Sequence, residues 1–462
     1  MFSRTWRSLV LVVGETLLLV AAVVISSVLI GGEYALEMLA DNTAILRVLL
    51  IVLVLQICLH YSDLYDLRTI TTKGDVFRRL LSALGVTSLI LGIAYWLFPL
   101  LIVEEGVFTV TVALALCLVM TWRSVFDWLM DHLAPRQRLL LVGTSPAAIL
   151  LARELFERRH ELGVEIVGFV DPDPMRVGAP VINPGVVGVI EDIPALTARL
   201  RVDRVVVSLS DARGKLPMEH LLDVRLRSGV LFDHLATVYE DYTGKIALEN
   251  LRPSWLVFST GFRKTWLLIV AKRMFDIVAA VCGLILSLPL TLLSALVVKL
   301  DSPKDPVLYH QERVGLNGAP FTIHKFRTMR TDAEASTGPV WSGTNDPRIT
   351  SVGAFMRKTR LDEIPQLWNV LRGDMSLIGP RPERPSFVEQ LTSQIPFYGQ
   401  RHVVKPGLTG WAQVRYAYGA TVEDAIEKMQ YDLYYVKHMS LAFDLLIALE
   451  TIKIVVLQRG GR

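Results

Sequence analysis

The sequence predicts a membrane α-helical bundle, then a Rossmann-like α/β domain, then a mainly α-helical domain that carries a re-entrant membrane helix. Of the 462 residues, 52% are hydrophobic, and long blocks contain most of them. After the fourth block, short apolar strands alternate with amphipathic helices, and a fifth block has basic residues at both ends. We therefore expect a four-helix transmembrane bundle at 1–135, a cytoplasmic α/β domain at 136–262, and a third domain at 263–462.

Four apolar runs in the first domain are long enough to be membrane helices. They lie at 9–30, 44–64, 80–103 and 107–126, and a helix needs ~20 mostly apolar residues to cross the hydrocarbon core. One carboxylate, Glu15, stands inside the first run. It is either a functional intramembrane acid or a side chain that faces the interior of the bundle, and we expect the second.

The charges that flank the runs predict their orientation. Basic residues stand before the first run (Arg4 and Arg7), after the second (Arg68, Lys73, Arg78 and Arg79) and after the fourth (Arg136 and Arg138). Acidic residues stand after the first run (Glu33, Glu37 and Asp41) and after the third (Glu104 and Glu105). Positively charged loops stay in the cytoplasm. We therefore expect both ends of the bundle, and everything after about residue 135, on the cytoplasmic side.

Composition argues against several other classes of protein. A net charge of +3 is too small to indicate a nucleic-acid partner. Cys58, Cys117 and Cys282 each lie singly in an apolar run, which argues against a disulfide framework and against a cysteine-rich metal site.

Residues 138–170 have the pattern of a strand, a tight turn, a helix and a second strand. A further strand at 204–209 and a helix near 218–228 continue the alternation, which is typical of a doubly wound parallel sheet. The turn at Gly143 is similar to a dinucleotide-binding fingerprint, but Ser145 stands where a second glycine would let a pyrophosphate approach. We expect a regulatory or assembly domain, with NAD binding as the alternative.

The fifth apolar run, 277–298, is long enough to span but has cytoplasmic-type charge on both sides. Pro289 lies in its middle, and a proline inside a helix removes a hydrogen bond and kinks the axis. We expect a helix that enters one leaflet and returns, at about 268–299, with its break at Ser287 and Pro289 and the Ser287 hydroxyl helping to cap the freed backbone. A plain fifth span with a kink is the alternative.

Basic residues and a carboxylate pair follow this run. Arginines bind phosphate oxygens in a bidentate manner, adjacent carboxylates can hold Mg²⁺, and a carboxylate can act as a nucleophile. Each residue alone has a structural alternative, since Asp362 could cap the next helix and the cations could be interfacial side chains. The candidate site consists of Asp362, Glu363, Lys325, Arg327, Arg357 and Arg381.

From about Ala271 onward, several ordered motifs resemble the monotopic phosphoglycosyl transferases, which are polyprenyl-phosphate sugar-phosphate transferases. The motifs lie at 272–276, Pro289, 324–329, 361–369, 376–383, 405–411 and 431–435. The order of four spans, an α/β domain and a transferase domain is similar to the large members of that family.

The resemblance implies a two-step reaction in the bacterial inner membrane. Asp362 would attack the β-phosphate of a UDP-sugar, UMP would leave, and undecaprenyl phosphate from the lipid bilayer would take the sugar-phosphate. It also implies that Glu363 is the partner of Asp362 and that both help to bind Mg²⁺. Arg357, Arg381 and Lys325 match positions near the phosphates. We expect a homodimer and a role in initiating exopolysaccharide, capsule or O-antigen synthesis.

Two other functions are considered. An NAD-dependent, membrane-anchored UDP-sugar dehydratase or epimerase would use a Tyr-x-x-x-Lys pair, and no tyrosine here has a lysine four residues later. A non-enzymatic scaffold for polysaccharide assembly would not need the intact Asp362–Glu363 pair. The transferred sugar stays open among glucose, galactose and N-acetylated hexoses. We expect residues 1–262 to be dispensable for the chemistry.

Overall fold

A computed structural model gives the structure of the chain. It describes residues 2–32, 44–62, 64–65, 73–99, 106–132, 136–157, 159–182, 184–208, 218–248, 259, 261–335, 338, 346–416, 419 and 421–456. Contacts divide the chain into two compact units, Met1–Leu235 and Ala236–Arg462.

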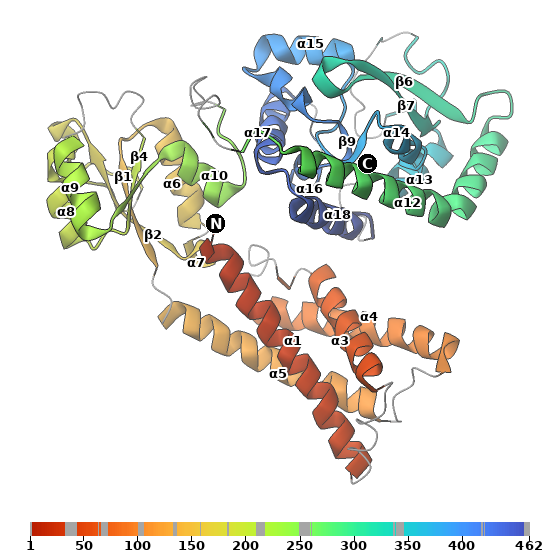
Figure 1. Cartoon of the computed structure of the whole chain (residues 1–462), viewed down its shortest axis with the longest axis horizontal. Coiled ribbons are helices and arrows are strands. Elements are labelled where there is room, and N and C mark those ends of the chain that lie inside the picture. Colours follow the sequence, from red (N-terminus) through yellow and green to blue (C-terminus); the bar gives the residue numbers. More distant parts are fainter. Residues whose placement is uncertain are drawn as a thin grey trace. The chain divides into compact units, whose positions relative to one another are not determined.

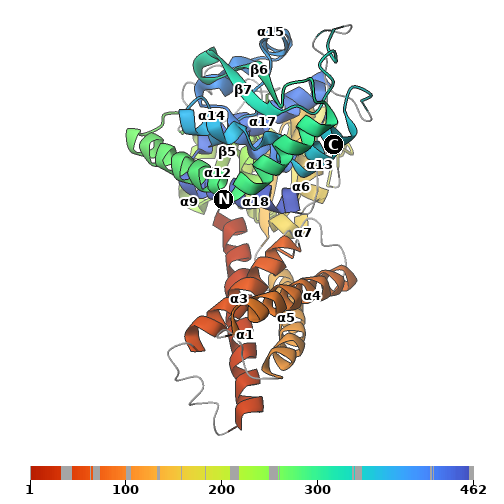
Figure 2. The ribbon, with the colours of Figure 1, turned by 90° about the vertical axis from the view of Figure 1, so that its right-hand side faces the viewer.

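Four N-terminal helices confirm the predicted bundle (Figures 1 and 2). They are α1 (Phe2–Gly31), α3 (Ala44–Tyr61), α4 (Lys73–Leu97) and α5 (Val107–His132). The helices α1, α4 and α5 contain stretches long and apolar enough to cross a membrane, and the apolar part of α3 is shorter. Because α4 begins and ends earlier than the run at 80–103, Arg78 and Arg79 belong to its first turns and not to a loop.

Glu15 faces the interior of the bundle, as expected. Its carboxylate lies 2.7 Å from Nε of Arg123 and accepts a hydrogen bond of 2.5 Å from the Tyr65 hydroxyl. Directly beside this ion pair in sequence, α1 and α5 approach closely at Gly14, where a Cβ atom would stand 2.4 Å from the Trp122 ring. A buried ion pair is costly unless it is well bonded, and these partners satisfy the Glu15 charge.

The α/β domain confirms the predicted doubly wound sheet. Its five parallel strands have the order β3-β2-β1-β4-β5. The helices α8 and α9 lie on one side of the sheet and α6 on the other (Figure 1). The elements are β1 (Gln137–Val142), α6 (Pro146–Glu157), α7 (Arg159–Leu162), β2 (Val164–Asp171), β3 (Val186–Val189), α8 (Ile193–Arg199), β4 (Arg204–Val207), α9 (Met218–Ser228) and β5 (Leu231–His234).

The turn after β1 uses its side chains within the protein. The Ser145 hydroxyl hydrogen-bonds that of Ser208 at 2.5 Å, and the Thr144 hydroxyl donates to Asp171 at the end of β2. Hydroxyl groups therefore occupy the place where a dinucleotide fold has glycine backbone.

The second unit begins with α10 (Leu235–Thr243), earlier than the boundary we expected between residues 262 and 263. Its residue Glu240 bonds to Lys437 at 2.7 Å, and the carbonyl of Gly244 accepts a hydrogen bond of 3.0 Å from the Trp411 indole. Ile246 lies in an apolar cluster with the buried side chain of Met429. The division therefore follows side-chain packing, which the change in sequence composition does not mark.

The membrane segment is one helix, α12 (Trp266–Asp301), with Pro289 inside it. Both views show that its ribbon bends along its length (Figures 1 and 2). The Ser287 hydroxyl is buried and has no hydrogen-bond partner among the residues that the structure describes, so it does not cap the backbone there as we expected. Instead the Thr291 hydroxyl donates to the carbonyl of Ser287, at 2.8 Å.

Charged residues clamp the first half of α12 to the rest of the second unit. Lys272 donates to the carbonyl of Ile378 and pairs with Asp444 at 2.7 Å. Arg273 donates to two carbonyls at the end of α14 (Gln366–Arg372), and Asp276 accepts from the backbone of Leu377. The spacing of the 272–276 motif follows from helix geometry: Lys272 and Asp276 lie one turn apart on the same face, and Arg273 points about 100° round the axis from Lys272 toward α14.

The remaining elements of the second unit follow α12 in the sequence. They are β6 (Leu308–Val314), β7 (Pro320–Phe326), α13 (Ser351–Thr359), η6 (Leu361–Glu363), α14, β8 (Ser376–Ile378), α15 (Pro385–Gln394), η7 (Tyr398–Val403), β9 (Gly407–Thr409), α16 (Trp411–Arg415), α17 (Val422–His438) and α18 (Leu441–Val456). β6 and β7 form an antiparallel hairpin, and β8 and β9 pair in parallel. Among these elements, α13 and β7 contact η6, which carries the carboxylate pair.

Candidate active site

The carboxylate pair lies on the short 3₁₀ turn η6, between α13 and α14. Arg360 ends α13 in the left-handed conformation, with φ +56°, and so turns the chain before Asp362 and Glu363. The N-terminus of α14 is at Pro365 and has no side-chain cap. The alternative in which Asp362 merely caps the next helix is therefore wrong.

Glu363 is held by three cations from three different segments. Its Oε1 atom lies 3.2 Å from Nζ of Lys325 and accepts a hydrogen bond of 2.9 Å from Nη2 of Arg381. Its Oε2 atom lies 3.5 Å from Nη1 of Arg360. Because charge-assisted bonds reach both oxygens, the carboxylate is fixed in orientation.

Asp362 has a different environment, although it is the neighbouring residue. Its side chain is buried, with 7% of its surface exposed, and no hydrogen bond or ion pair reaches its carboxylate from the part of the chain that the structure describes. Burial and the adjacent charge of Glu363 raise the pKa of Asp362 to about 6, against the opposing charges of Lys325, Arg357 and Arg381. The chain thus keeps one carboxylate anchored and leaves the other unengaged.

The electrostatics of the pair follow from this difference. Burial alone would raise the pKa of Glu363, but the charges of Arg381, Lys325 and Arg360 outweigh burial and hold the pKa well below its usual range. Burial lowers the pKa of Lys325, and the charge of Glu363 opposes that effect. With Arg357, the group contains two more cations than carboxylates, a surplus that suits the two charges of a diphosphate diester.

Lys325 is positioned by the β6–β7 hairpin. The buried side chain of Asn369 joins β7 to α14, since it donates to the carbonyl of Thr322 at 2.7 Å and accepts from the backbone of His324 at 3.1 Å. Asn369 ends the 361–369 motif, and its place explains why an amide, which can donate and accept at once, stands there.

Arg381 is positioned by the β8–β9 pair. Glycines allow these strands to approach, because a Cβ atom on Gly407 would lie 2.1 Å from the backbone nitrogen of Gly379. A Cβ atom on Gly410 would lie 2.1 Å from the carbonyl oxygen of Gly379. The motifs at 376–383 and 405–411 are therefore two sides of one backbone contact, and Arg381 lies just after it.

The other two predicted arginines differ in their placement. Nε of Arg357 donates to the Thr328 hydroxyl at 2.9 Å, and its charge lowers the pKa of Asp362. Arg327 is buried and donates to the carbonyl of Pro306 at 2.9 Å, and its described hydrogen bonds and ion pairs include neither Asp362 nor Glu363. The structure thus gives Arg327 a role in fixing the backbone, in contrast to the phosphate contact that we expected.

Arg360 is a residue that the motif analysis passed over. It stands between Arg357 and the carboxylate pair and contacts Glu363 three residues later. A signal was present, because Arg360 is the third cation of the 357–360 stretch and stands two residues before Asp362; its left-handed backbone could not be read from the sequence.

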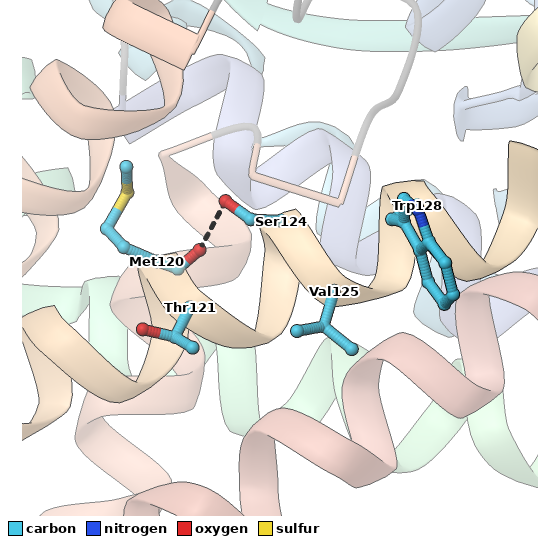
Figure 3. A pocket seen from close by; sticks show the side chains of 5 residues that line it. All are labelled: Met120, Thr121, Ser124, Val125 and Trp128. Atoms are coloured by element: carbon cyan, nitrogen blue, oxygen red, sulfur yellow. Dashed lines mark hydrogen bonds between the residues drawn. The ribbon is translucent and has the colours of Figure 1, made fainter.

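A cavity of ≈ 460 Å³ in the first unit is lined by these described residues of α5: Met120, Thr121, Ser124, Val125 and Trp128 (Figure 3). The Ser124 hydroxyl is already bonded to the carbonyl of Met120 at 3.0 Å. None of these described lining residues has a titratable side chain that could act as a general acid or base.

Much of the chain is similar to known proteins. The family model described as bacterial sugar transferase matches residues 267–458. The chain is 34% identical over 330 residues to UDP-glucose:undecaprenyl-phosphate glucose-1-phosphate transferase of Escherichia coli, which covers 70% of this chain and 69% of that protein. The chain belongs to the bacterial sugar transferase family. A second family model, described as a CoA-binding domain, matches residues 60–215.

Two further relatives of this family member differ in length. UDP-N-acetylgalactosamine-undecaprenyl-phosphate N-acetylgalactosaminephosphotransferase of Aeromonas hydrophila is 40% identical over 271 residues, which are 59% of this chain and 63% of that protein. A putative undecaprenyl-phosphate N-acetylgalactosaminyl 1-phosphate transferase of Bacillus subtilis is 50% identical over 138 residues, which are 30% of this chain and 76% of that protein.

A divalent metal fits the pair in part. Among the described residues, no group of three or more His, Cys, Asp or Glu side chains could form a cage. Mg²⁺ does not need one, because it is commonly held by one or two carboxylates together with substrate phosphates and water. Asp362 offers unengaged oxygens, whereas Glu363 would have to share its oxygens with three cations.

Proposed function

We propose that this bacterial sugar transferase moves a sugar-1-phosphate from a UDP-sugar to undecaprenyl phosphate, with Asp362 as the covalent nucleophile. One observation carries the proposal. Asp362 is buried next to a carboxylate that three cations hold, and of the two carboxylates only Asp362 has oxygens that no hydrogen bond or ion pair engages within the described residues. The names of relatives that transfer glucose or N-acetylgalactosamine phosphates support the general reaction.

In the first step, a carboxylate oxygen of Asp362 forms a bond to the β-phosphorus of the donor. The bond from that phosphorus to the bridging oxygen breaks, and UMP leaves with the bridging oxygen and its electron pair. In the second step, an oxygen of undecaprenyl phosphate attacks the same phosphorus and the Asp362 carboxylate leaves. The products are UMP and undecaprenyl diphosphate-sugar, and splitting the transfer into two steps lowers each barrier.

The cations have separate tasks in this scheme. Lys325, Arg357 and Arg381 lie around the carboxylates and would bind the diphosphate oxygens, where guanidinium groups match phosphate geometry. The anchored Glu363 keeps Lys325 and Arg381 in place before the donor arrives. Asp362 and Glu363 would also hold Mg²⁺, which neutralises charge on phosphoryl oxygens when it is bound.

We further propose that α12 enters the membrane from the cytoplasmic side and returns to it. Two groups of contacts support this. Lys272, Arg273 and Asp276 bind polar backbone in the second unit, and near the other end Val298 packs with Phe326 and Met356 of the same unit. Both ends of a 36-residue helix are therefore held by one folded body. The catalytic domain would lie on the cytoplasmic side of the inner membrane, where UDP-sugars are available.

The deciding experiment uses the full chain in detergent with a panel of UDP-sugars, undecaprenyl phosphate and Mg²⁺, and measures UMP. We expect release of UMP with a glucose, galactose or N-acetylated hexose donor. Without acceptor, intact mass spectrometry should show one phosphosugar on wild-type protein and none on Asp362→Asn. If the wild type releases UMP while Asp362→Asn retains the adduct, another residue is the nucleophile.

The same panel tests the alternatives. A dehydratase or epimerase would change the sugar without releasing UMP, and a scaffold would do neither. Initiation of exopolysaccharide, capsule or O-antigen synthesis, and a homodimeric state, belong to this proposal. Complementation of a strain that lacks its initiating transferase, and light scattering of the purified protein, test these two points.

A further inference from the structure

The segment that carries Arg381 is held unusually firmly for a stretch without regular secondary structure. Pro380 and Pro382 fix their own φ angles, and Pro382 restricts Arg381 to an extended backbone. The carbonyl of Pro382 accepts from Arg313 at 3.1 Å, and the carbonyl of Glu383 accepts from the backbone of Val314 at 2.9 Å. The segment is thus fastened at several successive residues.

The carbonyl of Arg381 itself is held by a second arginine. Nη2 of Arg401, in η7, donates to this carbonyl at 3.0 Å. The same guanidinium pairs with Asp432 of α17 at 2.7 Å, donates to the Tyr398 hydroxyl at 2.6 Å and stands over the Tyr398 ring at 5.1 Å. Arg401 is 5% exposed and Asp432 is 1% exposed, so this ion pair is fully inside the protein.

Burying such a pair costs free energy that apolar residues of similar volume would avoid. The bond from Arg401 to the Arg381 carbonyl suggests what the buried ion pair is for. From Asp432 a continuous path of bonds leads through Arg401 to the backbone of Arg381, and from the Arg381 side chain to Glu363.

We propose that Arg401 and Asp432 are positioning residues, which hold the Arg381 backbone so that its guanidinium stays on Glu363 beside the nucleophile. The inference rests on the proposed function, because it assigns Arg381 to the transfer site. Asp432 orients Arg401 and balances its charge, and Tyr398 fixes the plane of the guanidinium. A planar group with five donors can serve three acceptors at once, which a lysine cannot.

The test compares variants that act inside and outside this path. Arg401→Lys and the milder Tyr398→Phe weaken the hold on Arg381. The matched control is Glu240→Gln, which removes another buried carboxylate that bonds to α17, through Lys437 and His438, and whose described bonds do not reach the Arg381 segment. UMP release is measured at saturating and limiting donor, on protein normalised for folded content.

We expect Arg401→Lys to lower kcat ten- to hundredfold, since small misplacements of a binding group have effects of this size, and to change KM less than threefold. Tyr398→Phe should lower kcat less, and Glu240→Gln should keep kcat within twofold even if it unfolds at a lower temperature. In an Arg381→Ala background, Arg401→Lys should cost less than a further twofold. An equal loss in both backgrounds, or a wild-type kcat in Arg401→Lys, would overturn the inference.

The inference can also be judged if the proposed function fails. Should the wild type release no UMP from any donor, the same four proteins of the Arg381–Arg401 cycle are compared by thermal unfolding. A double variant that loses less stability than the sum of the two single variants supports the structural coupling, because Arg381→Ala then removes a contact with Glu363 that Arg401→Lys has already weakened. Additive shifts refute it.

Discussion

Asp362→Asn should stabilise the folded protein while it abolishes UMP release. Burial and the charge of Glu363 raise the pKa of Asp362 from 3.8 to about 6, and each pKa unit corresponds to 1.36 kcal/mol. Keeping this carboxylate ionised therefore costs the fold about 3 kcal/mol at neutral pH. A neutral amide of the same shape removes that cost, so the variant should unfold several degrees above the wild type at pH 7.5.

The linkage between protonation and folding determines how the stability difference between the wild type and Asp362→Asn changes with pH. Between pH 3.8 and about 6 the folded state binds more protons at Asp362 than the unfolded state does, so the wild type gains stability relative to the variant as pH falls. The amount by which the free energy of unfolding of Asp362→Asn exceeds that of the wild type should fall to about half its neutral-pH value at pH 5. Both proteins are measured by thermal unfolding in detergent with EDTA, so that no metal binds to the carboxylates.

Glu363→Gln is the matched control, because its carboxylate has the opposite environment. Three cations hold its pKa below the usual range, so its charge contributes stability above the unfolded pKa of about 4.5, and that contribution is lost as pH falls. This variant should unfold below the wild type at pH 7.5 and should also lose activity. The reasoning is refuted if both variants shift in the same direction, or if Asp362→Asn is not the more stable protein.

Three further predictions follow from the architecture. A cysteine at Ser393, which is exposed on α15, should not react with an impermeant thiol reagent in intact cells, and labelling there would mean that α12 is a full span. A chain that begins at residue 231 should stay folded and active in detergent, whereas one that begins at residue 260 should aggregate, because it lacks α10 and the buried Ile246. Equal activity of the two chains would contradict this prediction and would restore our first expectation that residues 1–262 are dispensable for the chemistry. Gly407→Ala should destabilise the second unit by about 3 kcal/mol, since its Cβ would overlap the backbone of Gly379, while Gly399→Ala, with open space around it, should change stability little.

The sequence predicts this protein best where a local pattern has one physical meaning. The apolar runs, the alternation of strands and helices, and the Asp362–Glu363 motif each anticipate what the structure contains. Prediction from the sequence fails where the role of a side chain depends on partners that are distant in the chain. Arg327 and Arg381 are both arginines with basic neighbours in the sequence, yet Arg327 binds the carbonyl of Pro306 and Arg381 binds Glu363.

The division of the chain was predicted less well for the same reason. Composition changes near residue 262, where a basic stretch precedes the apolar helix. The bonds that join α10 to the second unit run from Glu240 to Lys437 and from Gly244 to Trp411, across more than 160 positions of sequence. No window of local residues contains both members of such a pair, so pattern analysis could not place the boundary.

The clamp at the start of α12 also constrains how the protein is made. When the ribosome has produced Lys272, Arg273 and Asp276, their partners do not yet exist: Asp444 follows Lys272 by 172 positions, and the carbonyls for Arg273 follow it by about 100. Until then these charges need water, which hydrocarbon cannot supply. With α12 entering the membrane as proposed above, we therefore expect it to reach its final depth only after the C-terminal residues are synthesised and folded. Its lipid insertion should then be a late, post-translational step, whereas the N-terminal apolar helices can enter the bilayer as they emerge.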